Sequence, residues 1–385
     1  MPPGLCLFLV IAALLGTAPE VSRWKISLDQ SQGLERFDRD IDSLWMNQQG
    51  VLFLTPDKVL AYQVNRSRDQ ARLAPRDSSG GAGNFVLNIK VVSVQDGHLI
   101  KSLDLPTNGA FSSVIATRNG AFLARTGNVL YLYSANFEPL ASRQLPLDQT
   151  GPLESWQAKV SPSGEEVVLV HEKVLKRAEL LSDNTVLHDG EAKVVVEILN
   201  SDTLELAKTF TLSHTLPFWT LGDDLLVSSN PAHSYSDGQI GILDFNGKWS
   251  SIGIDSEIAN RDCRRSLSAI DQDRVILYGC ETLTVISTAG KSLFSRRDGR
   301  FVFRSADARG SYLAVACDRY RMAVEVPNDW FRTTRADRIE VYDLNRHSRL
   351  ASVRTHSERV YYAISAQGDL VIVDGTTLEL LQAGR

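Results

Sequence analysis

The chain has 385 residues, of which 43% are apolar and 23% are charged, and its 41 basic and 46 acidic side chains give a formal net charge of -5 at pH 7. This composition is globular and excludes a disordered chain, a coiled coil and a polybasic nucleic-acid binder. A chain of this length can bury a large core without disulfide staples.

The first residues of the chain resemble a secretory signal peptide. Leu5–Leu15 is an unbroken apolar run, and three small residues follow it at 16–18. The run is too short for a spanning helix, which needs about 20 residues, and a short run ending in small residues is typical of a secretory signal peptide. Residues 1–4 carry no basic side chain, which departs from the usual pattern. We expect residues 1–20 to be a signal peptide, the protein to be periplasmic or extracellular, and the mature chain to lack a membrane span.

Seven repeats follow, each with a polar turn and then a continuous apolar strand. The turns are Asn47–Gly50, Arg118–Gly120, Ser161–Gly164, Gly222–Asp224, Asp271–Asp273, Asp307–Gly310 and Ala366–Asp369. The strands after them are 51–54, 121–124, 167–170, 225–228, 275–278, 312–316 and 370–373. Turns rich in Gly, Asn and Asp between apolar runs indicate hairpins, and continuous apolar strands suit burial on both faces between neighbouring sheets.

A third strand recurs in every repeat, and its last residues are 39 to 65 residues apart. These strands are 89–94, 129–133, 193–198, 239–243, 282–286, 338–342 and 377–381. The smallest of these spacings, about 40 residues, equals the length of a four-stranded propeller blade. A more polar fourth strand follows in six repeats, and the seventh lacks it. We predict that the spare N-terminal strand at Trp24–Leu28 completes that last blade and closes the ring, because an open ring leaves an unpaired strand edge.

The predicted fold is therefore all-β, a single seven-bladed β-propeller over residues 21–385 with its last blade closed by an N-terminal strand. The predicted blades cover residues 40–108, 109–150, 151–214, 215–260, 261–300, 301–357, and 358–385 with 23–30. A large β-sandwich is the alternative.

The third strands carry a family resemblance. EVYDLN at 340–345 and GILDFNG at 241–247 are similar to the end of a WD40 third strand. The organisation resembles the seven-bladed propellers of the WD40 and YVTN-repeat type, in a divergent bacterial form without any Trp-Asp dipeptide. The resemblance implies the fold and no particular function.

Four long insertions fall in the connections between second and third strands, at about residues 64–87, 172–191, 229–237 and 318–337. In such a propeller these connections emerge on one face, whereas the turns of the opposite face are tight here. Loops gathered on one side of a rigid scaffold are where function usually resides, although surface loops also tolerate drift.

The insertion at 318–337 combines aromatic and arginine side chains, which dominate interface hot spots. The candidate binding residues are Arg319, Tyr320, Arg321, Trp330, Phe331 and Arg332, with His233 and Tyr235 from the third insertion and Arg264 and Arg265 entering the fifth blade. The alternative is that Trp330 and Phe331 only pin the loop to its own blade. We expect a monomeric binding scaffold whose partner is a protein or a small molecule.

The sequence lacks the linear motifs of metalloproteases, serine hydrolases, phosphate-binding loops and Cys-x-x-Cys sites. We therefore assign no catalytic residue, metal, cofactor or nucleic-acid partner. Two alternatives stay open, because a propeller can build a site from one residue per blade. One is a hydrolase or lactonase acting at the central channel, and the other is a cofactor propeller in which Trp219 stacks on a quinone-like group.

Three cysteines follow the signal segment: Cys263, Cys280 and Cys317. The predicted fifth-blade hairpin brings Cys263 and Cys280 nearly opposite each other, so we expect a disulfide between them in an oxidising compartment. A Cys280–Cys317 bridge across blades, or three buried thiols that act as small apolar groups, are the alternatives.

Overall fold

The computed structural model describes eighteen stretches of the chain, and all statements about the structure refer to them. They are residues 21–28, 34–36, 49–67, 85–107, 112–145, 157–161, 163–176, 179–180, 186–188, 191–212, 218–222, 225–229, 240–244, 248–252, 266–279, 281–319, 337–356 and 360–382. The described residues form β-strands joined by short turns, with a single 3-10 turn at Arg118–Gly120 and no α-helix. None of the described segments is a helix long and apolar enough to cross a membrane.

The strands form antiparallel sheets, numbered here in chain order. Sheet 1 holds β2 (Leu34–Arg36), β3 (Gln49–Thr55), β4 (Lys58–Ser67), β5 (Phe85–Ser93) and β6 (Leu99–Thr107). Sheet 2 holds β7 (Ser113–Ala116), β8 (Phe122–Thr126), β9 (Val129–Tyr133) and β10 (Pro139–Gln144). Sheet 3 holds β11 (Gln157–Val160), β12 (Glu166–Lys176), β15 (Glu191–Asn200) and β16 (Leu206–Leu212), and a small hairpin of β13 (Glu179–Leu180) and β14 (Val186–His188) lies between its second and third strands.

The later sheets repeat the same plan. Sheet 4 holds β17 (Phe218–Gly222), β18 (Leu225–Ser229), β19 (Ile240–Asp244) and β20 (Trp249–Ile252). Sheet 5 holds β21 (Ser266–Ala269), β22 (Arg274–Gly279), β23 (Thr282–Ser287) and β24 (Ser292–Arg297). Sheet 6 holds β25 (Phe301–Arg309), β26 (Tyr312–Arg319), β27 (Arg338–Asp343) and β28 (Ser348–Arg354). Sheet 7 holds β29 (Val360–Ile364), β30 (Asp369–Asp374), β31 (Thr377–Gln382) and β1 (Val21–Ser27).

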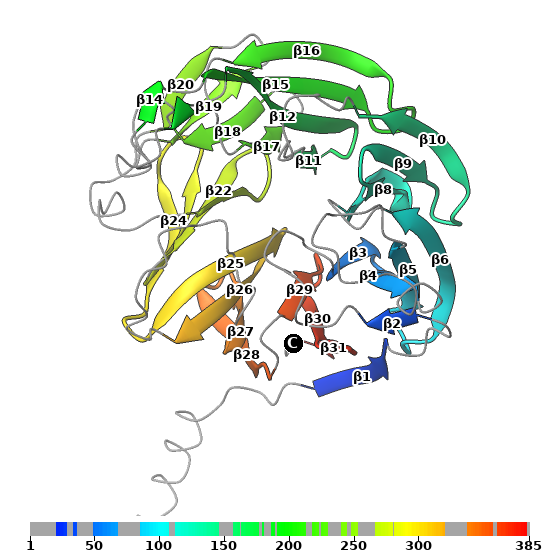
Figure 1. The fold of residues 1–385 in the computed structure, drawn as a ribbon. Helices are drawn as coiled ribbons and strands as arrows, with labels where there is room; N and C mark the ends of the chain where they lie inside the picture. Colours follow the sequence, from blue (N-terminus) through cyan, green and yellow to red (C-terminus); the bar gives the residue numbers. More distant parts are fainter. Residues whose placement is uncertain are drawn as a thin grey trace, which may run out of the picture.

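The sheets stand side by side around a ring, with the first strand of each nearest the centre (Figure 1). Neighbouring sheets contact one another all the way round, and the contacts return from β29 to β3. The apolar core lies between the sheets, as in the packing of Phe294 of sheet 5 against Phe303 and Tyr342 of sheet 6. The fold is thus an all-β propeller, as the apolar second strands predicted.

Six of the sheets are regular four-stranded blades, one fewer than the seven blades predicted. Sheet 1 has five strands, because both β2 and β3 pair with the long strand β4. β3 pairs with residues 58–63 of β4 and β2 with residues 65–67, so the two short strands follow one another along the same edge.

The strand order expected in sheet 1 was wrong. Residues 51–54 were predicted to be a second strand after a turn at Asn47–Gly50, but Gln49 and Gly50 already lie in β3, and β3 is an inner strand. The second strand is β4, which the prediction missed. A buried apolar run suits either position, because only contacts with the neighbouring sheets decide which strand lies inside.

The N-terminal strand β1 pairs with β31, which confirms the predicted completion of the last sheet. The strand also reaches the first sheet: the indole N–H of Trp24 donates a hydrogen bond to the carbonyl of Val94 at 2.8 Å, and the Lys90 ammonium donates to the carbonyl of Leu28 at 2.7 Å. Gly97 has a φ of +73° and lies against the Trp24 ring, where a Cβ atom would come within 2.8 Å of it. Strand β1 therefore ties sheet 7 to sheet 1.

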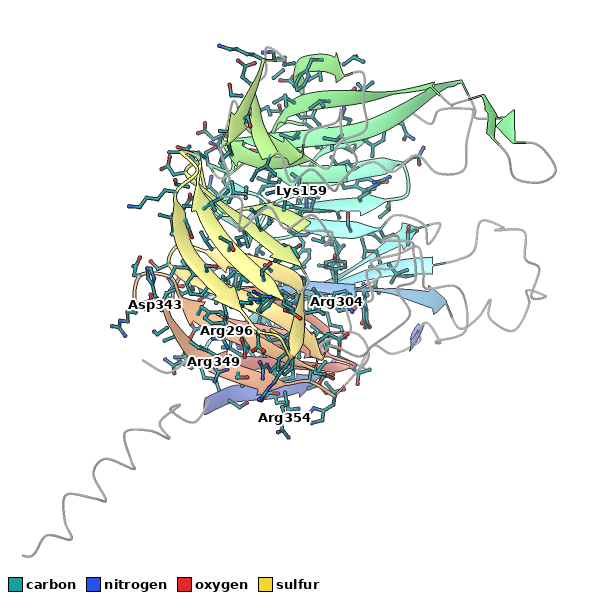
Figure 2. All side chains as sticks on the ribbon, turned by 90° about the vertical axis from the view of Figure 1, so that its left-hand side faces the viewer. Lys159, Arg296, Arg304, Asp343, Arg349 and Arg354 are labelled. Carbon is teal, nitrogen blue, oxygen red and sulfur yellow. The ribbon has the colours of Figure 1, made fainter. Side chains whose placement is uncertain are left out.

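The two ends of the ring differ. At one end, here called the turn end, two to five residues join the first strand of each sheet to the second. At the other, the long-loop end, the second-to-third connections are long between β4 and β5, β12 and β15, β18 and β19, and β26 and β27. These are the four predicted insertions. In sheets 2, 5 and 7 the same connection has only two residues, and Figure 2 shows the ring from the side with the β13–β14 hairpin projecting from it.

Candidate functional site

Most of the binding residues predicted from sequence lie outside the described residues. Arg319 is the last residue of β26, where it pairs with Phe301 at the long-loop end. Trp219 lies in β17 opposite Val227. The residues outside the described ranges are His233, Tyr235, Arg264, Arg265, Tyr320, Arg321, Trp330, Phe331 and Arg332. Their roles stay predictions, and the structure places only the strands from which their loops leave.

Of the three cysteines, Cys317 lies in the described part of the chain, where it is a free and buried thiol. It is therefore not bridged to Cys280. Burial raises the pKa of the Cys317 thiol to about 12, so it is protonated at neutral pH and is not a nucleophile. Cys263 and Cys280 lie outside the described residues, and the disulfide between them stays a prediction.

Near the ends of β26 and β27 at the long-loop end lies a cluster around Glu340, whose side chain is 0% exposed. Arg338 and Arg349 each place a guanidinium nitrogen 2.8 Å from Glu340 Oε1, and the Tyr342 hydroxyl donates to Oε2. Arg296, from the outer strand of sheet 5, approaches the same carboxylate at 3.8 Å. Residues 338, 340 and 342 share one face of β27 because alternate residues of a strand point the same way.

The surroundings of the cluster offset the cost of burying a carboxylate. The Arg338 guanidinium lies 3.5 Å from the centre of the Phe301 ring, and Arg296 lies 5.5 Å from that of Tyr342. Asp298, in the connection from sheet 5 to sheet 6, is 3.6 Å from Arg296 and 3.5 Å from Arg338. The cluster therefore fastens the outer strand of sheet 5 to the third strand of sheet 6.

The same network fixes the base of the 320–336 connection. Arg338 opens β27 and pairs with Cys317 of β26. The Asp337 N–H donates to the Cys317 carbonyl at 2.8 Å, so the two strands remain joined up to the point at which the connection leaves. A loop that starts and ends on such a base is presented from a rigid support.

Four exposed arginines stand around this base: Arg297, Arg300, Arg304 and Arg354. We call them the arginine face. Arg297 ends β24 and its side chain is 77% exposed, while Arg304 lies on the inner strand β25 and is 46% exposed. In Figure 2, Arg304 and Arg354 are labelled nearer the long-loop end than Asp343.

Two acidic residues at this end are mostly buried, while a third, Glu281, is 33% exposed beside Arg297. The side chains of Asp318 and Asp298 are 12% and 18% exposed, and each is within ion-pair distance of at least one arginine. Arg300 and Arg354 have no side-chain partner among the described residues. The surface that faces solvent is therefore positively charged, although the charges beneath it nearly balance.

Polar side chains of the inner strands of sheets 6 and 7 make hydrogen bonds between the two sheets. Asp307 accepts a hydrogen bond from the Ile364 N–H at 2.8 Å, and the Tyr362 hydroxyl lies 2.9 Å from Ser305 Oγ and accepts from the Ala316 N–H. Burial raises the pKa of Asp307 above its ordinary value. These contacts join sheets 6 and 7.

His98, His347 and His356 are exposed. His98 Nδ1 lies 2.6 Å from Asp96 on an exposed turn, and His356 lies 3.5 Å from Asp374. Within the ranges that the structure covers, no group of three or more His, Cys, Asp and Glu residues could hold a metal ion. The described part of the chain therefore gives the channel enzyme alternative no catalytic set.

Sequence reasoning located the long-loop end and missed the Glu340 cluster. The missed signal is the R-x-E-x-Y order at 338–342, which puts a carboxylate between two polar groups on the buried face of an otherwise apolar strand. A glutamate at a buried position requires partners. Its other partners, Arg296 and Arg349, come from two further strands, and no linear spacing connects them.

No protein-family profile matches the chain, and no curated protein is similar to it in sequence. Solved structures are similar in fold. Pyrococcus horikoshii acylaminoacyl peptidase is 10% identical with a TM-score of 0.51, and the match covers 86% of this chain and 52% of the peptidase. An acylaminoacyl peptidase in complex with Z-Gly-Gly-Phe-chloromethyl ketone is 10% identical with a TM-score of 0.52, covering 86% of this chain and 51% of that one.

A third structure, the Dos1 propeller, is 10% identical with a TM-score of 0.44, covering 95% of this chain and 96% of that one. The chain spans about half the length of the two peptidases. At such identities the likeness concerns the fold alone. The chain is thus a β-propeller whose function has to be argued from its own residues.

Proposed function

We propose that the protein is an exported binding scaffold that holds a partner at the long-loop end of the propeller, through the 320–336 connection and the arginine face. The observation that carries the proposal is the asymmetry of the ring. Four long connections leave one end, whereas the opposite end has first-to-second strand turns of two to five residues. A rigid ring with loops on one end is a common support for recognition.

The Glu340 cluster supports this site. Its arginines and acids hold the strands on either side of the 320–336 connection, so the loop is presented at a defined place. The residues proposed to meet the partner are Arg319, Tyr320, Trp330 and Phe331. Aromatic and arginine side chains contribute much of the binding energy at interfaces.

Two finer points belong to the same proposal. Sheet 1 acts as the seventh blade, because β2 and β3 share one edge of β4 and the sheet is therefore four strands wide. Export rests on the apolar run at 5–15 ahead of β1. Amino-terminal sequencing of the protein from a cell envelope tests export, since the proposal requires a chain that begins close to Val21.

The test of the binding site is capture with a trimmed loop. A C-terminally tagged full-length chain is compared with a variant in which an Asn-Gly turn replaces residues 320–336. The strands permit this turn, because Cys317 already pairs with Arg338, and Asp318, Arg319, the inserted Asn-Gly and Asp337 then form a five-residue hairpin loop between them. We expect the full chain to retain a partner from an envelope extract and the trimmed chain to lose it.

A matched control removes residues 68–84 from sheet 1 in the same way, since Arg66 and Phe85 pair at the base of that connection. The partner is identified by mass spectrometry, purified and titrated against all three chains. Equal melting temperatures show that trimming left the fold intact. Retention of the partner by the chain trimmed at 320–336 would contradict the proposed site.

A further inference from the structure

Basic residues outnumber acidic ones in the segment that runs from the last strand of sheet 5 through sheet 6. Residues 291–354 contain 14 basic and 8 acidic side chains, whereas the rest of the chain has 27 basic and 38 acidic ones. An overall acidic protein thus carries one positive sector. Of the 14 basic residues, 13 are arginines, which bind carboxylates through two parallel hydrogen bonds in a way that lysine cannot.

Within this sector the exposed charge is positive because burial has sorted the two signs. Glu340 is fully buried and Asp318 is 12% exposed, whereas Arg297 is 77% exposed. Arg300 and Arg354 are exposed and lack side-chain partners in the described part of the chain. Exposed guanidinium groups without a carboxylate partner are available to an incoming anion.

We propose that the arginine face binds an acidic polypeptide segment, so that the partner at the long-loop end has a run of Asp and Glu side chains. This inference rests on the proposed function and names the chemistry of its partner. A peptide segment suits the site because the four arginines of the face lie on or between two neighbouring sheets, whereas the rest of the chain has more acidic than basic side chains. A nucleic acid or an anionic membrane would extend over that acidic remainder and be repelled by it.

The probe is a fluorescein-labelled oligoglutamate peptide of about ten residues, titrated by fluorescence anisotropy against the tagged full-length chain at low ionic strength, where the Debye length exceeds ~10 Å. We expect saturable binding that weakens steeply with salt. The double variant R300E/R354E is expected to weaken binding by about tenfold or more, because like charges across an interface repel.

The chain offers a matched control pair. Arg297, at the long-loop end, and Arg346, at the turn end, are both 77% exposed, and each has Nε 3.6 Å from one carboxylate oxygen. R297E is expected to weaken peptide binding by several-fold and R346E to leave it within about twofold, because a charge at the far end is screened over that distance. Equal weakening by both variants would show binding by net charge alone and would overturn the inference.

Three further titrations separate the sources of negative charge. They use a double-stranded oligonucleotide, vesicles with anionic phospholipid, and inorganic phosphate in the same buffer. The inference is overturned if the peptide fails to bind, or if the oligonucleotide or the vesicles bind more tightly than the peptide does. If R300E/R354E still binds the peptide while trimming 320–336 abolishes partner capture, the acidic partner is wrong and the binding site stands.

Discussion

Asp307 is a carboxylate placed where the inner strands of sheets 6 and 7 meet. It accepts a hydrogen bond from the Ile364 N–H at 2.8 Å, and burial raises its pKa above the ordinary value of 3.8 while nearby Arg309 lowers it. A raised pKa in the folded state means that the protonated form is favoured by folding. The stabilising contribution is complete below pH 3.8 and is lost as pH rises through the pKa of the folded state.

This sign leads to a prediction for Asp307→Asn. The amide keeps an oxygen acceptor for Ile364 and carries no charge, so the variant should be more stable than the natural chain at pH 7, by up to about 1 kcal/mol. The advantage should shrink as pH falls and vanish below 3.8. Urea unfolding followed by circular dichroism between pH 3.5 and 8 measures this difference.

Asp307→Ala provides the comparison, because it removes the acceptor as well as the charge. This variant should be less stable than Asp307→Asn at every pH, since a buried N–H is left without a partner. A stability difference between Asp307→Asn and the natural chain that does not change with pH would contradict the pKa argument.

At the level of the strand, β1 links the last sheet to the first. Trp24 is buried and its indole N–H donates to Val94 across the seam at 2.8 Å. Trp24→Ala should lower the free energy of unfolding by about 3–5 kcal/mol, because it removes both a large buried ring and its hydrogen bond. Circular dichroism during urea unfolding reports the change without relying on tryptophan fluorescence.

Trp24→Phe separates the two losses. Most of the ring packing remains and the Val94 carbonyl loses its donor, so the cost should fall to about 1–2 kcal/mol. If Trp24→Ala were no more costly than Trp24→Phe, the ring would contribute nothing to the seam, and the closing role of β1 would rest on the β31 pairing alone.

The repeat pattern predicted most strands because each sheet buries its second and third strands on both faces. β8, β22 and β30 each contain an unbroken apolar run, at 122–124, 275–278 and 370–373, and runs of this kind are visible in sequence. Sheet 1 departs from the pattern because its inner strand β3 is also apolar, and position within a sheet depends on neighbours rather than on composition.

The sequence predicted which loops of the candidate site are long, but not the side-chain cluster at their base. The lengths of the second-to-third connections identified the long-loop end, because insertions can be counted from sequence. The Glu340 cluster was not predictable in this way, since Arg296 is 44 residues from Glu340 in the chain. Distant partners come together only when sheets 5 and 6 pack.

At the scale of the whole molecule, the ring is closed by strand β1, which pairs with sheet 7 and continues in the chain into sheet 1. The contacts between sheets return from β29 to β3, and the chain that leaves β1 continues into sheet 1. Val21 lies opposite Gln382, so the start of β1 is beside the end of β31. The strand could therefore be supplied from either direction, and only the natural order makes the backbone span the seam.

A rearranged chain tests what that order contributes. Residues 1–28 are removed from the front, and residues 21–28 are appended after Gln382 through an Asn-Gly turn, which the Val21–Gln382 register permits. We expect the same far-ultraviolet circular dichroism, because β1 still pairs with β31 and Trp24 still reaches Val94. The free energy of global unfolding should stay within about 1 kcal/mol, because both chains are linear and equally unrestricted when unfolded. Opening of the seam should become easier, because β1 then contacts sheet 1 only through bonds such as those of Trp24 and Lys90, whereas in the natural order the seam opens only if the β1–β31 pairing breaks. Native-state hydrogen exchange measures this opening, and equal exchange at the seam in the two chains would show that the ring is closed by side-chain contacts rather than by the backbone.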